Sequence, residues 1–112
     1  MRKPRVIILD DEVFILNMLK DFFLTEGYEV LSYSDPTSIC PIHGKGGDRC
    51  CLHHRCSDVL ITDFRMPGGN GIDLLERQSR NGCKMDMRNK AVISGDIDDR
   101  NRMRVRQLGC AF

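Results

Sequence analysis

The feature that most restricts the fold of this chain is the alternation of short aliphatic runs with segments of helical periodicity. Four runs predict buried strands, at 5–9, 28–33, 58–62 and 90–93. Three further segments predict helices, at 13–24, 71–80 and 98–108. Strands that alternate with helices form a parallel sheet with helices on both faces. The sequence therefore predicts an α/β fold, a doubly wound parallel sheet.

Length and charge limit the classes of protein to which the chain can belong. It has 112 residues, which predicts one domain over 1–112, and its formal net charge is +1. A near-zero charge gives no general attraction to nucleic acid or anionic lipid. The apolar runs are far shorter than the roughly 20 residues of a membrane span, and no signal-peptide core follows the basic N-terminus. We therefore expect a cytoplasmic domain with no direct nucleic-acid or membrane partner.

Polar side chains follow three of the predicted strands where those strands end. Asp10 and Asp11 follow the first strand, Asp63 the third and Ser94 the fourth. Each residue alone is explained by a helix cap or a turn. Together they meet at one sheet edge, where carboxylates without an adjacent Lys or Arg repel one another unless a divalent cation holds them. Oxygen ligands suit Mg²⁺, so the joint pattern favours a site.

The same residues carry a resemblance to a known family. In their order and spacing they resemble the receiver domain of two-component response regulators, over nearly the whole chain except residues 34–57. The resemblance implies a flavodoxin-like sheet of strand order 2-1-3-4, with the fifth strand incomplete or absent. The residues that carry it are the acid pair Asp10 and Asp11 before Glu12, Asp63 followed by Met66, Pro67 and Gly71, and Ser94 before Gly95.

The resemblance also implies a role for each member of the acidic group. Asp63 would be the phosphoacceptor, a nucleophile that takes a phosphoryl group from a phosphohistidine of a sensor histidine kinase. Asp11 and Asp63 would bind Mg²⁺ with the backbone carbonyl of Arg65, while Asp10 would orient metal-bound water. Ser94 would be the switch hydroxyl that signals to a downstream protein target. This is a signalling domain and not an enzyme; an aspartyl phosphohydrolase is disfavoured because Arg65 stands where such enzymes carry a second Asp.

The C-terminal residues depart from the family pattern. Receivers normally have a fifth strand that ends in a Lys, and a fifth helix after it. Residues 108–112 resemble the beginning of that strand, with Phe112 near the family's switch aromatic, and no Lys follows. Lys90, where the fourth strand begins, cannot substitute for it. We therefore expect the C-terminal strand and helix to be missing and the exposed edge to favour a homodimer or a strand swap.

Residues 34–57 are the second departure, an insert rich in Cys and His that replaces the usual second helix. Thiolate and imidazole are ligands that suit Zn²⁺, so a second metal site is one hypothesis. A redox disulfide and an inert loop are the alternatives. A degenerate receiver that acts as a metal- or thiol-based sensor or interaction module is the alternative function. The residues concerned are Cys40, His43, Cys50, Cys51, His53, His54 and Cys56.

Three other patterns yield expectations about packing. Residues 13–24 carry apolar pairs four residues apart, which draw one stripe along a helix. Cys83 and Cys110 are expected to behave as small hydrophobic residues. The alternating arginines of the last helix predict a solvated surface; they are Arg100, Arg102, Arg104 and Arg106.

Overall fold

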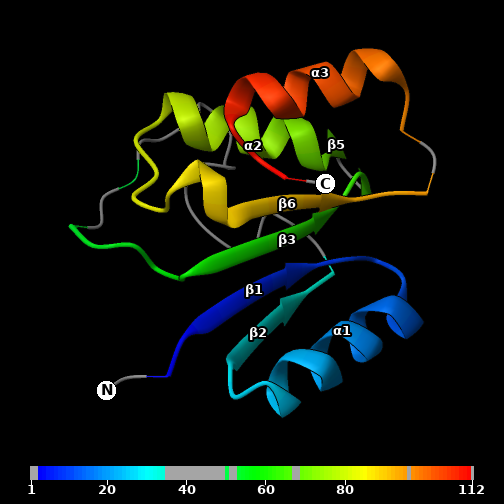
Figure 1. Cartoon of the computed structure of the whole chain (residues 1–112), viewed down its shortest axis with the longest axis vertical. Helices are drawn as coiled ribbons and strands as arrows, with labels where there is room; N and C mark the ends of the chain where they lie inside the picture. Colours follow the sequence, from blue (N-terminus) through cyan, green and yellow to red (C-terminus); the bar gives the residue numbers. More distant parts are fainter. Residues whose placement is uncertain (1–2, 35–49, 51–52, 67–68, 96, 112) are drawn as a thin grey trace.

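The computed structural model describes residues 3–34, 50, 53–66, 69–95 and 97–111, and its centre is a four-stranded parallel sheet. The strand order is β2-β1-β3-β6, with β6 as the fourth strand of the chain's main sheet (Figure 1). This order is the predicted 2-1-3-4, so the fold class is confirmed. The strands are β1 (Arg5–Leu9), β2 (Glu29–Tyr33), β3 (Val59–Asp63) and β6 (Lys90–Ile93).

The helices are close to the predicted ones. They are α1 (Val13–Thr25), α2 (Gly71–Arg80) and α3 (Asp99–Leu108). Gly27 and Gly109 follow α1 and α3 with positive φ angles of 89° and 84°, a conformation that favours glycine and ends a helix. The sequence did not predict three short elements: the antiparallel pair β4 (Arg65–Met66) and β5 (Gly69–Asn70), and the 3₁₀ turn η3 (Met87–Asn89).

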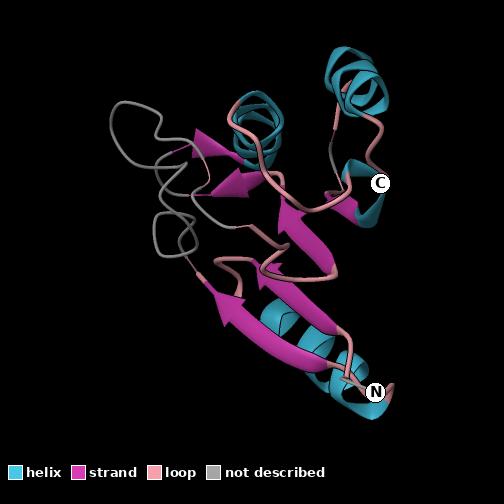
Figure 2. Ribbon diagram, turned by 90° about the vertical axis from the view of Figure 1, so that its left-hand side faces the viewer, coloured by secondary structure: helices cyan, strands magenta, loops and turns pink. Residues whose placement is uncertain are grey.

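The main core lies on one face of the sheet. Because side chains alternate along a strand, Ile7 and Leu9 point to the same face, and both pack in one buried cluster with Ile72 of α2 and Val105 of α3. Val6 and Ile8, both 0% exposed, point to the other face, where α1 contacts β1 and β2. Figures 1 and 2 show α1 beside β1 and β2, apart from the pair formed by α2 and α3.

The apolar stripe of α1 is only half covered, which the sequence pattern did not show. None of the side chains of α1 is buried. The second residue of each pair, such as Ile15, is partly buried, whereas Phe14, Met18 and Phe22 are 86%, 62% and 55% exposed. Within the described ranges α1 is the one helix on its face of the sheet, and a single helix covers only the residues that point directly at the strands.

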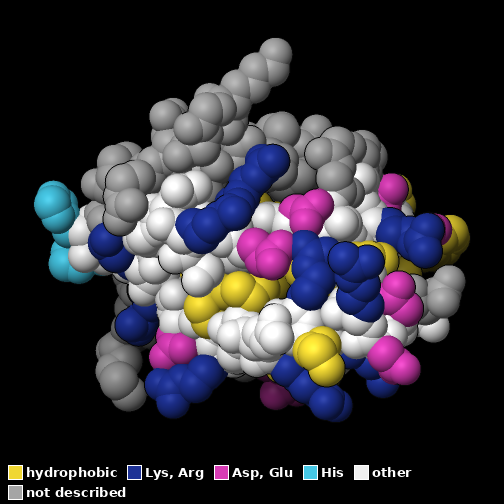
Figure 3. Space-filling view, turned by 90° about the horizontal axis from the view of Figure 1, so that it is seen from above, with side chains coloured by type: hydrophobic (Ala, Val, Ile, Leu, Met, Phe, Trp, Pro, Cys, Tyr) yellow, Lys and Arg dark blue, Asp and Glu magenta, His cyan; other side chains and the backbone are white. Residues whose placement is uncertain are grey.

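The surface of α3 is largely solvated, as predicted, with one exception. The Nη2 of Arg104 donates to Asp73 Oδ1 of α2 at 2.7 Å and also to Glu76 Oε1. These two carboxylates raise the pKa of the Arg104 guanidinium. Seen from above, Lys and Arg side chains lie beside Asp and Glu on this side of the molecule (Figure 3). Arg104 therefore ties α3 to α2, and the other arginines of α3 are exposed.

The C-terminal residues continue the sheet next to β6. Ala111 forms an isolated parallel bridge with Ala91: the Val92 N–H donates to the Ala111 carbonyl at 3.0 Å, and the Ala111 N–H donates to the Lys90 carbonyl at 2.9 Å. The bridge occupies the position expected for the start of a fifth strand. Phe112 lies outside the described residues. Among the helices of the described ranges, none has the length and apolar character needed to cross a membrane.

Candidate functional site

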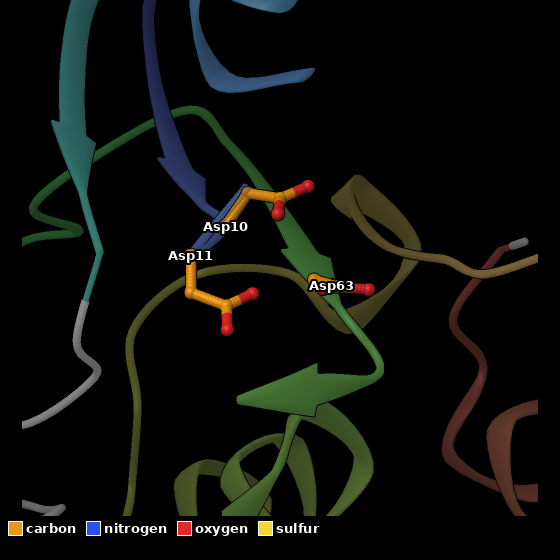
Figure 4. A group of neighbouring side chains, drawn as sticks. All are labelled: Asp10, Asp11 and Asp63. Atoms are coloured by element: carbon orange, nitrogen blue, oxygen red, sulfur yellow. The ribbon is translucent and has the colours of Figure 1, made fainter. Parts of the chain in front are cut away.

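Three carboxylates meet at the carboxyl edge of the sheet. Asp10 and Asp11 follow β1, and Asp63 is the last residue of β3. One oxygen from each lies within 4.8 Å of the others, and Figure 4 shows the side chains grouped at the ends of the two strands. The structure therefore brings together the acidic residues that the sequence singled out.

Asp10 holds the turn after β1 through its hydrogen bonds. Its side chain is nearly buried, its N–H donates to the Tyr33 carbonyl at 3.1 Å, and its Oδ1 accepts the Glu12 N–H at 2.8 Å. These bonds fix the turn from β1 into α1, while one carboxylate oxygen of Asp10 stays within 4.8 Å of the other two carboxylates. Asp11 is exposed, so it is open to solvent ligands. Asp11 does not cap α1, which begins after Glu12 without a side-chain cap.

Asp63 is fixed by its backbone neighbours. The Phe64 N–H donates to the Ile93 carbonyl at 3.2 Å, and the Gly71 N–H donates to the Phe64 carbonyl at 2.8 Å. The hydroxyl of Thr62 donates to the Asp63 carbonyl at 3.0 Å. The loop after β3 is therefore held at both ends, by β6 and by the first residue of α2.

Gly71 has a role that the sequence did not predict. A Cβ at this position would lie 2.3 Å from the Asp63 carbonyl oxygen and 2.9 Å from the Thr62 side chain. No side chain fits there, so glycine lets the start of α2 contact the strand that carries Asp63. Asn70 caps the helix by accepting the Asp73 N–H at 2.9 Å. The sequence signal, Asn before Gly at the start of an amphipathic helix, indicates the cap but not the close contact.

The surroundings of Asp63 change the pKa of its carboxyl group. Burial is the largest cause that raises the pKa of the Asp63 carboxyl, and the negative charges of Asp10 and Asp11 raise it further. Backbone N–H groups of Phe64 and Arg65 act in the opposite direction. The net direction of the pKa is upward, because burial and the repulsion from the two neighbouring carboxylates both disfavour the ionised form of Asp63. A divalent cation among these oxygens would relieve that repulsion, so the donor set fits a hard cation such as Mg²⁺.

Ser94 lies at the same edge. It follows Ile93, the residue that pairs with Asp63 across β3 and β6, and it is half-buried. Beside it opens a groove of about 350 Å³ that Ile97 and Arg102 also line. Arg65 lies in β4, immediately after the Asp63 turn, with its guanidinium 5.8 Å from the Phe64 ring centre. Ser94 therefore lies one residue beyond the strand partner of Asp63, and Arg65 lies two residues after Asp63.

The described part of the Cys and His insert does not form a metal centre. His53 and His54 are exposed, Cys50 and Cys56 are half-buried, and these residues make no group of three ligand atoms within 4.8 Å of one another. The zinc hypothesis therefore gains no support from them. The other three candidates, Cys40, His43 and Cys51, lie outside the described residues.

Comparison with known proteins gives the same assignment over nearly the whole chain. A family model described as the response regulator receiver domain matches residues 6–111. The aerobic respiration control protein ArcA of Escherichia coli is 32% identical over 80 residues, which is 71% of this chain and 29% of that protein. The chain thus spans less than a third of the length of this relative.

Solved structures show the same fold. A CheY-like response regulator receiver domain from Methanospirillum hungatei superposes with a TM-score of 0.76 at 21% identity, covering 99% of this chain and 81% of that one. The non-phosphorylated HemR receiver domain from Leptospira biflexa gives a TM-score of 0.74 at 19% identity, covering 98% and 81%.

Proposed function

The chain belongs to the receiver-domain family of two-component response regulators, and from this premise we propose that it accepts a phosphoryl group on Asp63 from a histidine kinase. The observation that carries the proposal is the grouping of Asp63 with Asp10 and Asp11 within 4.8 Å at the carboxyl edge of the sheet. Asp63 would attack the phosphorus atom with a carboxylate oxygen, and the kinase histidine would leave as the P–N bond breaks.

Each neighbouring residue has a defined task in this reaction. Gly71 and the backbone bonds at Phe64 hold Asp63 at the strand end, which positions the attacking oxygen. Asp11, Asp63 and the carbonyl of Arg65 would hold Mg²⁺, and Asp10 would orient its water ligands. Mg²⁺ supplies charge neutralisation at the phosphoryl oxygens when bound, since phosphoryl transfer depends mainly on positioning and electrostatics.

Ser94 would respond to the phosphoryl group on Asp63. Its half-buried hydroxyl follows the residue paired with Asp63, so it is placed to donate to a phosphoryl oxygen. Movement of Ser94 would reshape the groove lined by Ile97 and Arg102, at the beginning of the segment that leads into α3. The signal would then pass to a downstream protein through this surface.

The test is intact-protein mass spectrometry after incubation with acetyl phosphate, with and without MgCl₂. Wild type should gain one phosphoryl group only with Mg²⁺, and Asp63→Asn should gain none. Asp21→Asn, which removes an exposed carboxylate of α1, is the matched control and should react like wild type. An adduct that persists in Asp63→Asn, or no adduct on a folded wild type, would contradict the proposal.

A further inference from the structure

Lys90 is the most unusual buried residue outside the acidic site. It occupies the first position of β6, at the end of the sheet opposite to Asp63, and is 0% exposed. Its Nζ donates to Gln78 Oε1 at 2.6 Å and lies 3.2 Å from Cys83 Sγ. Among the residues that the structure describes, these are its side-chain partners, and neither is a carboxylate.

A buried ammonium requires a counter-charge. Transfer of a charged group from water to a protein interior is costly unless an opposite charge lies beside it. Gln78 offers an amide oxygen that cannot ionise, whereas Cys83 can supply a negative charge by losing its thiol proton. The thiolate is the nucleophilic form of cysteine, and a neighbouring Lys favours that form.

We propose that Cys83, whose sulfur accepts a hydrogen bond from Lys90 Nζ, is a nucleophile that reacts with hydroperoxides. Cys83 is half-buried, so part of the residue is open to a small oxidant, and it is a free thiol. Cys110 provides an internal contrast: burial raises the pKa of its thiol, although the charge of Lys90 acts against this. Burial therefore disfavours the nucleophilic thiolate form of Cys110, which makes Cys110 the reference thiol for Cys83.

The reaction balances with a hydroperoxide as the oxidant. The Cys83 thiolate attacks the terminal oxygen, an S–O bond forms and the O–O bond breaks. The leaving alkoxide or hydroxide takes a proton from Lys90 and departs as alcohol or water. Sulfur is oxidised by two electrons to a sulfenic acid, and a neutral amine remains beside it.

The test is kinetic trapping of sulfenic acid in the complete, reduced chain. Hydrogen peroxide is added with dimedone, and the labelled peptides are quantified by mass spectrometry. Trypsin cuts after Arg80 and Lys84, which separates Cys83 from every other cysteine of the chain. Cys83 should be labelled at least about tenfold faster than Cys110. Equal rates at Cys83 and Cys110 would overturn the proposal.

Gln78→Glu tests the pairing itself. A carboxylate at this position would become the counter-charge of Lys90, so labelling of Cys83 should fall toward the rate of Cys110. Gln107→Glu adds the same charge on the exposed surface of α3 and should leave the rate unchanged. A folded Gln78→Glu variant that labels Cys83 as fast as wild type would overturn the role of Lys90. If this variant does not fold, the comparison of Cys83 with Cys110 in wild type still decides the proposal.

Discussion

Replacement of Gly71 by Ala tests how the fold positions Asp63. The added Cβ would lie 2.3 Å from the Asp63 carbonyl oxygen, where ordinary van der Waals contact begins at 3.4 Å. The start of α2 and the end of β3 must therefore separate by about 1 Å. Both contacting groups belong to the backbone or to the buried Thr62, so no flexible side chain can move aside.

The expected cost follows from two opposing terms. Overpacking in a well-packed region costs about 1–3 kcal/mol. Alanine has a higher helix propensity than glycine, which returns up to about 1 kcal/mol. Because the 2.3 Å clash is with a backbone atom, the cost lies at the upper end of that range, and we expect a net loss of about 2 kcal/mol in the free energy of unfolding. This loss lowers the Tm of a domain of this size by roughly 8 °C. A 1 Å displacement of Asp63 should also slow phosphoryl uptake roughly a hundredfold.

Two assays and one control check this prediction. Thermal unfolding gives the Tm, and intact-protein mass spectrometry gives the rate of phosphoryl uptake from acetyl phosphate. Gly95→Ala is the matched control, because a Cβ at Gly95 would meet no atom within 4 Å. The control should retain the Tm and the uptake rate of wild type. If Gly71→Ala behaves like Gly95→Ala in both assays, the inferred contact does not position Asp63.

Three other predictions concern charge and exposed surface. With EDTA present, the free energy of unfolding of wild type should fall relative to that of Asp63→Asn as the pH rises above 3.8, because folded Asp63 keeps its proton to higher pH than the unfolded chain. Urea unfolding at several pH values measures both proteins, and parallel pH profiles would refute this cause. Arg104→Met should lower the free energy of unfolding, measured with urea, by about 1 kcal/mol, whereas Arg100→Met should leave it unchanged. Equal losses in the two variants would exclude a stabilising ion pair at Arg104. The exposed apolar side chains of α1 should make the protein self-associate, and the double variant Phe14→Ser, Met18→Ser should abolish this association. Light scattering measures the molar mass, and a monomeric wild type would reject the prediction.

Local patterns were sufficient to predict the sheet and the acidic group. The runs at β1 and β3 are almost wholly apolar because both faces of a parallel strand are covered, and they stop at Asp10 and Asp63, at the carboxyl edge of the sheet. Parallel strands share one carboxyl edge, so the grouping of these aspartates follows from topology alone. The glycines after α1 and α3 ended the helices at the predicted places.

Contacts between distant residues could not be predicted in the same way. The sequence singled out Gly71 only as part of the family resemblance, because its approach to Asp63 depends on how α2 docks on the sheet. Arg104 pairs with α2 only because the two helices lie side by side. Lys90 stands in a strand that otherwise has apolar residues, and nothing local indicates that α2 supplies Gln78 to meet it.

The most direct test of the account is to locate the phosphoryl group in the chain. The phosphorylated protein is reduced with borohydride, which converts an aspartyl phosphate into homoserine, and is then digested with trypsin. Cleavage after Arg55 and Arg65 gives one peptide that contains both Asp58 and Asp63. Fragmentation should place homoserine at 63 and leave Asp58 unchanged. Homoserine at 58, or at any aspartate outside this peptide, would contradict the assignment of Asp63 as the phosphoacceptor.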